Sequence, residues 1–453
     1  MTFGKKQSRR RGSVLILAMG ITVVLAGMVL VFTRQMRVEA LASGNLVSSL
    51  QSDAVIRGAA LYVSNRLENN QSRSTLDSEI QSEFVPVGEG SFWLLRPDAE
   101  DEHRYGFGVI DESSKLNINT ATFDMLIRLP NMSAELAASI IDWRDEDDTV
   151  SEGGGAESEH YLLQPDPYYC KNAPFETLEE LKLVKGATPE ILFGVDYNHN
   201  GVVDQNESGE TTGLSGLNGQ AACGIWKYLT VNSIEPNLTS TGEPRLFVGE
   251  LDNRTVDSLA RLFGTSVPAD RITEITTRLR GQPPPLNILD FYKKSGMTVA
   301  EFKLVADKIT TDRAPVLQGR INVNTAPREV LRCLPGLEDA DADALIAKRS
   351  SNGPDLDTIA WVADALPAEK LNQIGSAITT RSYQYSADIL AASGSGRGFK
   401  RVRYVYDLRT TPIKVVYRKD LSHLGWPLDE GIREMLRSGV FQQPGILAMG
   451  KQR

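Results

Sequence analysis

Cysteine and histidine are scarce in this chain, which has three cysteines and four histidines among 453 residues. The cysteines form no CxxC pair and the histidines lie far apart, so the close ligand pairs of a zinc site are missing. The sequence also lacks a nucleophile beside a base, a paired-carboxylate signature and a cofactor fingerprint. We therefore expect neither zinc nor enzyme activity, and an anchored hydrolase has no positive support.

Basic charge is also in deficit. Lysine and arginine number 49 against 58 aspartates and glutamates, which gives a formal net charge of −9. Such a surface repels phosphate but suits a divalent cation. Cys170 and Cys223 lie in polar segments, and two alternatives stay open: they pair in an oxidising compartment, or they stay free. Cys333, on an apolar helical face, is expected to be a buried thiol.

One long apolar run lies near the N-terminus. Ser13 to Thr33 carries no charged residue, and a basic cluster between positions 5 and 11 precedes it. About 20 apolar residues span the hydrocarbon core of a bilayer as a helix. A secretory signal has a shorter core with a cleavage site close behind, whereas Arg34 and Arg37 follow here. The run predicts a retained anchor with a cytoplasmic N-terminus and the rest of the chain across the membrane.

Gly12 separates the basic cluster from this run, and the helical period continues beyond it. This arrangement resembles the class III signal of type IV pilins and type II secretion pseudopilins, which implies that a prepilin peptidase cuts between Gly12 and Ser13. Such proteins usually carry glutamate at the fifth mature position. Leu17 stands there, which suits a subunit at the tip of an assembly; an ordinary anchor is the alternative. The apolar row beyond the membrane is Val38, Ala42, Leu46, Leu50 and Ala54.

One segment of the chain occurs twice. Residues 116–144 and 321–349 align without a gap at an offset of 321 − 116 = 205. Both copies contain Asn-apolar-Asn-Thr-Ala and Leu-Pro, and both end in arginine. Each is predicted to be a compact helical hairpin, with Thr120 and Thr325 as caps of the first helices.

The repeated pattern is similar to the helix-hairpin-helix motif, which in many proteins offers the backbone N–H groups of a glycine-rich turn to a DNA phosphate. The first copy has no glycine at that turn. The second has Gly336, but four carboxylates follow between positions 338 and 343. We expect a structural or protein-contact role and no nucleic acid partner; a membrane-anchored DNA receptor for uptake is the alternative function.

Between the copies lies DYNHNGVVDQNE, residues 196–207, which satisfies the calcium-loop pattern D-x-[DN]-x-[DN]-G-x5-E. Oxygen ligands in a short loop suit Ca²⁺, and because no helix follows, weak binding with a dissociation constant of about 10⁻⁴ to 10⁻³ M is expected. A surface turn rich in Asn and Gly is the alternative. The expected ligands are Asp196, Asn198, Asn200, Val202 through its carbonyl, Asp204 and Glu207.

The anchor, the segment YGFGVIDESSKLNINTA at 105–121, both hairpin copies, DWRDEDD at 142–148 and the C-terminal strand segments together resemble the type II secretion protein K family of large minor pseudopilins. The resemblance implies a single-pass protein of the inner membrane whose C-terminal domain lies in the periplasm. It would cap the tip of the pseudopilus and help to initiate its assembly for protein export. The implied partners are other minor pseudopilins, the major pseudopilin, prepilin peptidase and inner-membrane lipid.

Family members also bind calcium in the helical domain, which points to a second metal region; a solvated acidic loop is the alternative. The residues concerned are Asp145, Asp147, Asp148 and Glu157.

The expected fold class is α+β: a long N-terminal transmembrane helix and a pilin-like α/β core with a large inserted helical domain that contains two helix-hairpin-helix, or SAM-like, repeats. Strands are expected at 91–96, 104–110, 402–408 and 413–417, and a flexible connector at 394–398. The expected segments are a leader at 1–12, the transmembrane helix at 13–33, the first part of the core at 34–111, the insertion at 112–383 and the last part of the core at 384–453.

Overall fold

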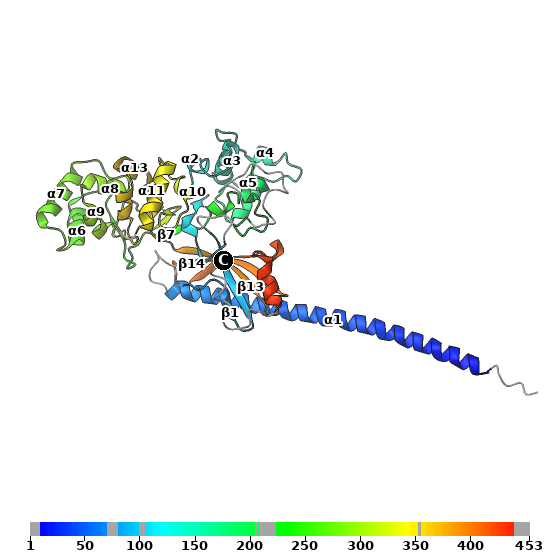
Figure 1. Ribbon diagram of the computed structural model, residues 1–453. Coiled ribbons are helices and arrows are strands. Elements are labelled where there is room, and N and C mark those ends of the chain that lie inside the picture. Colours follow the sequence, from blue (N-terminus) through cyan, green and yellow to red (C-terminus); the bar gives the residue numbers. More distant parts are fainter. Residues whose placement is uncertain are drawn as a thin grey trace, which may run out of the picture.

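The computed structural model describes residues 10–69, 80–98, 105–203, 207, 223–351 and 355–438. It has three layers (Figure 1): helix α1 lies along one face of an antiparallel sheet, and a large region of short helices lies on the other side of that sheet. This arrangement confirms the α+β class with a long N-terminal helix.

Helix α1 runs without interruption from Arg10 to Asn69. Its N-terminal part extends away from the rest of the protein, and its C-terminal part packs on the sheet (Figure 1). The packed face carries Val55, Ile56, Ala59, Val63 and Leu67, each at most 4% exposed. Burial of an aliphatic side chain of this size stabilises a fold by about 1.5–3 kcal/mol. This face therefore holds the helix to the sheet.

The apolar row expected on α1 lies on a different face of the helix. Val38, Leu46 and Leu50 are 61%, 61% and 59% exposed, whereas the buried Ser48 and Ser52 lead into the packed face. The helix thus keeps an apolar flank that no other described part of the chain covers.

The sheet has the strand order β1-β2-β13-β14-β15, with every pair antiparallel; β3 also pairs with β2, and β4 with β13. The central strand β13 is buried along its whole length and was not among the expected strands. The expected connector at 394–398 is the turn between β13 and β14. The strand expected at 104–110 is two short strands that Gly108 separates. The bounds are β1 Val85–Val87, β2 Gly90–Pro97, β3 Tyr105–Phe107, β4 Ile110–Asp111, β13 Gln384–Ala392, β14 Phe399–Asp407 and β15 Lys414–Asp420, followed by η6 Ser422–Leu424 and α14 Glu430–Arg437.

The region of short helices connects β4 to β13. Because Asp111 of β4 pairs with Tyr385 of β13, the two ends of this region meet at neighbouring strands. Its helices surround one continuous apolar core. They are α2 Phe123–Leu126, α3 Ala134–Arg144, α4 Ser158–Tyr161, α5 Pro189–Phe193, α6 Asn253–Phe263, α7 Ala269–Arg280, α8 Ile288–Ser295, α9 Val299–Val305, α10 Arg328–Leu331, α11 Asp339–Ser350, α12 Val362–Ala365 and α13 Ala368–Ile374, with the 3₁₀ helices η2 Glu112–Ser114, η3 Leu178–Leu183, η4 Trp226–Tyr228 and η5 Ile359–Trp361.

Four two-stranded pairs join these helices. They are β5 Leu116–Asn117 with β6 Leu229–Thr230, β7 Ile234–Pro236 with β10 Val316–Gln318, β8 Leu246–Phe247 with β9 Ile309–Thr310, and β11 Ile321–Asn322 with β12 Ile378–Thr379.

The two sequence copies fold alike. Each has a short strand, a four-residue helix and a longer helix that ends near an arginine: β5, α2 and α3 in the first copy, and β11, α10 and α11 in the second. Arg144 donates to the carbonyls of Ile118 and Ala121, and Arg349 donates to those of Val323 and Ala326. These acceptors are equivalent at the offset of 205, so each arginine closes its own hairpin in the same way.

The expected helix caps were wrong. Thr122 caps α2 by accepting from the Met125 N–H, because the helix begins two residues later than Thr120 indicates. Pro327 precedes α10, and the Thr325 hydroxyl donates instead to the buried Asp111 carboxylate at 2.5 Å. Thr325 thereby ties the second copy to strand β4.

All three cysteines are free and buried, so no disulfide joins Cys170 to Cys223. Cys170 belongs to the large apolar core, and Cys223 packs with Val195 and Val203. Their sequence neighbours are polar, but tertiary packing buries both thiols.

Candidate functional site

The calcium-like loop follows helix α5 and folds back on itself. The carboxylate of Asp196 accepts from the N–H groups of Asn200 and Gly201 at 3.0 and 2.8 Å, and Glu207 Oε1 accepts from the Tyr197 N–H at 2.9 Å. Gly201 has φ of 80°, which glycine adopts at little cost. The pattern residues therefore surround one turn.

Most of the expected ligands are buried in this turn. Asp196, Asn200 and Glu207 are 4%, 6% and 6% exposed, and Val202 is 1% exposed. The side-chain oxygens of Asn198 and Asn200 accept from N–H groups of the loop at 3.0 and 2.7 Å. Asp204 lies outside the described residues.

Burial raises the pKa of Asp196 to about 6, although the N–H donors of Gly201 and Asn200 oppose the shift. A buried carboxylate with a raised pKa gains stability when a cation approaches. The donors are all hard oxygens, so the residues present fit Ca²⁺. Within the described ranges, however, no three His, Cys, Asp or Glu side chains converge as metal ligands in this arrangement.

The loop is attached to the sheet by a buried ion pair. Arg401 on β14 donates to both carboxylate oxygens of Asp388 on β13, and also to the carbonyls of Asn198 and His199 at 2.6 and 2.8 Å. The Asn200 amide donates to the Pro427 carbonyl at 2.7 Å. The candidate loop is thus fixed to the strands. Arg401 and Asp388 were not among the expected site residues. Because β14 also carries Lys400, Arg403 and Asp407, no local signal singles out Arg401.

The ring of His199 packs against an aromatic side chain and is not expected to bind a metal. It stacks on Phe193 with a centroid distance of 3.8 Å. Burial, and then the positive charges of Lys182 and Arg401, lower the pKa of His199 to about 4. The imidazole is therefore neutral at pH 7.

The second acidic region brings Asp145 and Glu157 together with Asp142, a residue not among the expected ligands. Asp142 is fully buried, and its carboxylate accepts from the Ser151 N–H. Glu157 is 3% exposed, and among the described residues neither of its carboxylate oxygens accepts a hydrogen bond within the distance limits, although the nearby Cys170 thiol favours the ionised form; Asp145 Oδ1 also lacks a described partner. Burial, and then the charge of Asp142, raise the pKa of Glu157 to about 7. Asp148 is exposed and accepts from Asn172 at 3.0 Å.

The turn of the second hairpin is covered. A side chain at Gly336 would collide with Gln373, and the Asp341 carboxylate that follows is paired with Lys370. Arg328 pairs with Asp343 at 2.6 Å. Arg328 and Lys370 are therefore engaged by carboxylates of this hairpin, and Arg128 of the first hairpin donates to the carbonyls of Arg332 and Leu337.

Helix α1 is, within the described ranges, the one helix long and apolar enough to cross a membrane. Together with the antiparallel sheet packed on its C-terminal part, it defines a pilin-like subunit with a single membrane-length helix. Gly12 and Ser13 lie in the first turns of this helix.

Two sequence models of one family match the chain, both described as type II secretion system protein K, over residues 109–194 and 321–381. The chain belongs to the type II secretion system protein K family and is a minor pseudopilin, a structural component and not an enzyme. A solved structure, the GspK-GspI-GspJ complex from enterotoxigenic Escherichia coli, is 12% identical; the match covers 85% of this chain and 99% of that chain, with a TM-score of 0.38. No curated protein matched.

Proposed function

We propose that this minor pseudopilin caps the tip of the periplasmic pseudopilus and helps to initiate its assembly. The observation that carries the proposal is the uncovered apolar flank of α1, which continues past the membrane-length segment to Leu50. Such a flank needs partner helices to cover it. The sheet and the insertion together form the head of the protein. The insertion lies on the side of the sheet opposite α1 and widens the head (Figure 1), which hinders the addition of a further subunit above this one.

The proposal includes anchoring in the inner membrane, with the head in the periplasm, and cleavage between Gly12 and Ser13. Co-expression with prepilin peptidase should yield a mature chain that begins at Ser13, read by N-terminal sequencing. A chain that keeps its first 12 residues under those conditions contradicts the processing step.

The proposed partners are other minor pseudopilins and, below them, the major pseudopilin. Leu17, at the fifth position of the processed chain, is apolar and has no carboxylate to pair with the terminal amine of a subunit above it. Immunogold labelling of pseudopili should mark one end of each filament. Labelling along the whole length contradicts a tip position.

We also propose that the loop at 196–207 binds Ca²⁺ weakly, supported by the buried carboxylates of Asp196 and Glu207. The melting temperature should rise when calcium replaces a chelator, and Glu207→Ala should lose this rise. Glu243→Ala, an exposed carboxylate outside the loop, is the control and should keep it. If calcium raised the melting temperature of both variants equally, the loop would not be the calcium site.

The two hairpins are proposed to be helix-hairpin-helix units with a structural role. The covered turn at Gly336 and the paired side chains of Asp341 and Arg328 support this role over DNA binding. A gel-shift assay at low salt should show no complex; a salt-sensitive complex would favour the DNA receptor.

A further inference from the structure

A pair of adjoining cavities lies where the helical region meets the sheet. Their volumes are about 110 and 80 Å³, and we call them together the junction cavity. An apolar cavity of about 150 Å³ holds benzene, so the two adjoining cavities have room for one small organic molecule only when taken together. Both cavities are lined by Lys115, Leu178, Phe193, His199, Trp226 and Arg403.

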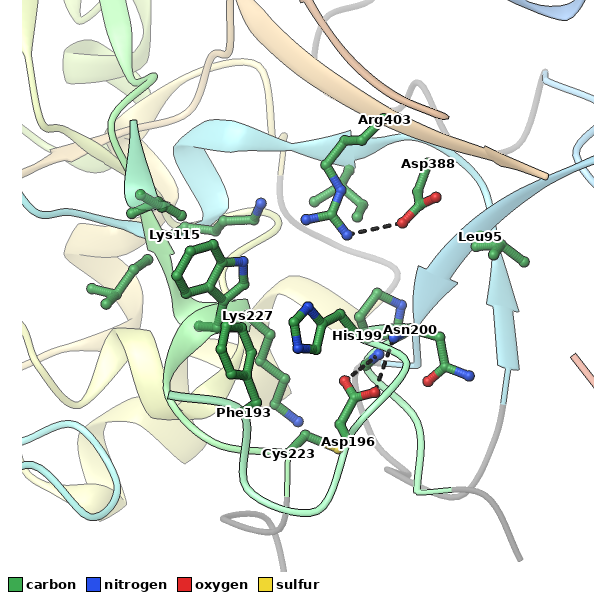
Figure 2. Close-up of a pocket in the computed structure, with 16 residues that line it drawn as sticks. Leu95, Lys115, Phe193, Asp196, His199, Asn200, Cys223, Lys227, Asp388 and Arg403 are labelled. Carbon is green, nitrogen blue, oxygen red and sulfur yellow. Dashed lines mark hydrogen bonds and ion pairs between the residues drawn. The ribbon is translucent and has the colours of Figure 1, made fainter. Parts of the chain in front are cut away.

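The guanidinium group of Arg403 is only partly neutralised by the carboxylate to which it donates. Arg403 donates to Asp388 Oδ2 at 2.9 Å, but Arg401 already binds both oxygens of that carboxylate, so two guanidinium groups share one negative charge. The Nε atom of Arg403 is buried and donates to no acceptor in the described parts of the chain. In Figure 2 the guanidinium of Arg403 and the ammonium of Lys115 turn toward the space beside the His199 ring.

A second cation lies at the edge of the larger cavity. The Lys182 ammonium lies 5.4 and 5.9 Å from the ring centres of Phe193 and Trp226, and it forms no ion pair with any described carboxylate. In contrast, the Lys115 ammonium is 2.7 Å from Glu112, and Lys419 is paired with Glu179. Arg403 and Lys182 are thus the groups with unused capacity for an anion.

One part of the wall is apolar, although carboxylates also line the two cavities, among them Glu112, Glu176, Glu179, Asp196 and Asp388. Phe193 and Trp226 are in contact, with a centroid distance of 4.9 Å, and Leu178 adds an aliphatic surface beside them. A site with an apolar wall and a few convergent cationic groups is typical of small-molecule binding. The guanidinium group matches the geometry of a carboxylate in particular.

We propose that the junction cavity binds a small organic carboxylate, with its anionic end against Arg403 and its apolar body along Phe193 and Trp226. The bound molecule would contact β14 of the sheet and η3 and α5 of the insertion. The inference is independent of calcium binding and of the position at the filament tip.

Benzoate is the probe for the full-length protein in detergent, with benzamide as the uncharged analogue of equal shape. Isothermal titration should show saturable benzoate binding and no benzamide binding. Arg403→Gln should weaken binding by at least about tenfold, the size of one lost charge-assisted hydrogen bond. Because this change touches the buried Asp388, the exposed Lys182→Gln is the second variant and should weaken binding severalfold. Lys293→Gln, on the exposed side of α8, should bind as the wild type does.

Three outcomes overturn the proposal: no saturable benzoate binding at millimolar concentration, equal binding of benzamide, or unchanged benzoate affinity in Lys182→Gln. If the cavity instead receives an acidic side chain of a partner protein, free benzoate should show no saturable binding. In that case Lys182→Gln should weaken the binding of the partner protein.

Discussion

Arg401 on β14 and Asp388 on β13 form a two-point ion pair that is closed to solvent, with Nε–Oδ1 and Nη2–Oδ2 distances of 2.9 and 2.7 Å. Their side chains are 0% and 3% exposed. The same guanidinium holds two carbonyls of the calcium-like loop. One buried arginine therefore joins the sheet to the insertion.

Removing this arginine should destabilise the protein. Arg401→Leu leaves Asp388 with Arg403 as its charged partner and removes one donor each from the carbonyls of Asn198 and His199, at a cost of about 3–5 kcal/mol. Chemical denaturation of the purified protein measures the change. Lys303→Leu removes a partner of the more exposed pair with Asp355 and should cost no more than about 1 kcal/mol. Similar losses in both variants would contradict a special role of Arg401.

The ion pair also predicts a dependence of stability on pH. Burial alone would raise the pKa of Asp388, but Arg401 and Arg403 lower it from 3.8 to about 2. A lowered carboxyl pKa adds stability above pH 3.8 that is lost as the pH falls toward 2. The free energy of unfolding should fall as the pH is lowered from 3.8 toward 2. In Asp388→Asn this dependence on pH should be weaker. An unchanged slope in that variant would mean that other carboxylates cause the acid sensitivity.

Glu157 should destabilise the calcium-free protein at pH 8. Both of its oxygens are buried without hydrogen-bond partners among the described residues, so Glu157→Gln should stabilise the chelated protein by about 1–3 kcal/mol. If the acidic region around Glu157 binds calcium, calcium should also raise the melting temperature of the variant less than that of the wild type. Glu159→Gln changes an exposed neighbour and serves as the control. A lower free energy of unfolding for Glu157→Gln in the presence of chelator would show that the ionised carboxylate does not destabilise the protein.

The two faces of α1 should respond differently to substitution. Ile56 is 2% exposed against the sheet, so Ile56→Ala should cost about 2–5 kcal/mol of head stability. Leu50 is 59% exposed, so Leu50→Ala should change head stability by no more than about 0.5 kcal/mol. Co-purification with other minor pseudopilins should fall for Leu50→Asp even though the head stays folded. Normal co-purification would place the partner contact elsewhere.

The sequence predicted the elements with strong local signals. The long N-terminal helix, the repeated segment and strands β2, β14 and β15 were predicted correctly because periodicity and composition are local properties. Strand β13 was missed since it is covered on both faces, and its Ser386 and Asp388 interrupt the apolar pattern that a buried strand usually shows.

The candidate site also combines residues that local sequence patterns indicate with residues that only the tertiary fold brings close. The ligands proposed for the loop follow from spacing along the chain, whereas Arg401 is more than 190 residues from the loop, and its contact with the loop depends on strand register. Asp142 lies close to the expected acidic residues in sequence, but only the folding of α3 against the 151–157 segment buries it beside Glu157.

The insertion leaves the sheet at β4 and returns at β13, two strands that are hydrogen-bonded to each other. Its attachment points are therefore already side by side in the sheet. Changes in the size or surface of the insertion need not alter the register of the strands or the packing of α1. The sheet with α1 and the insertion can thus diverge at different rates, provided that contacts such as that of Arg401 with the loop are kept.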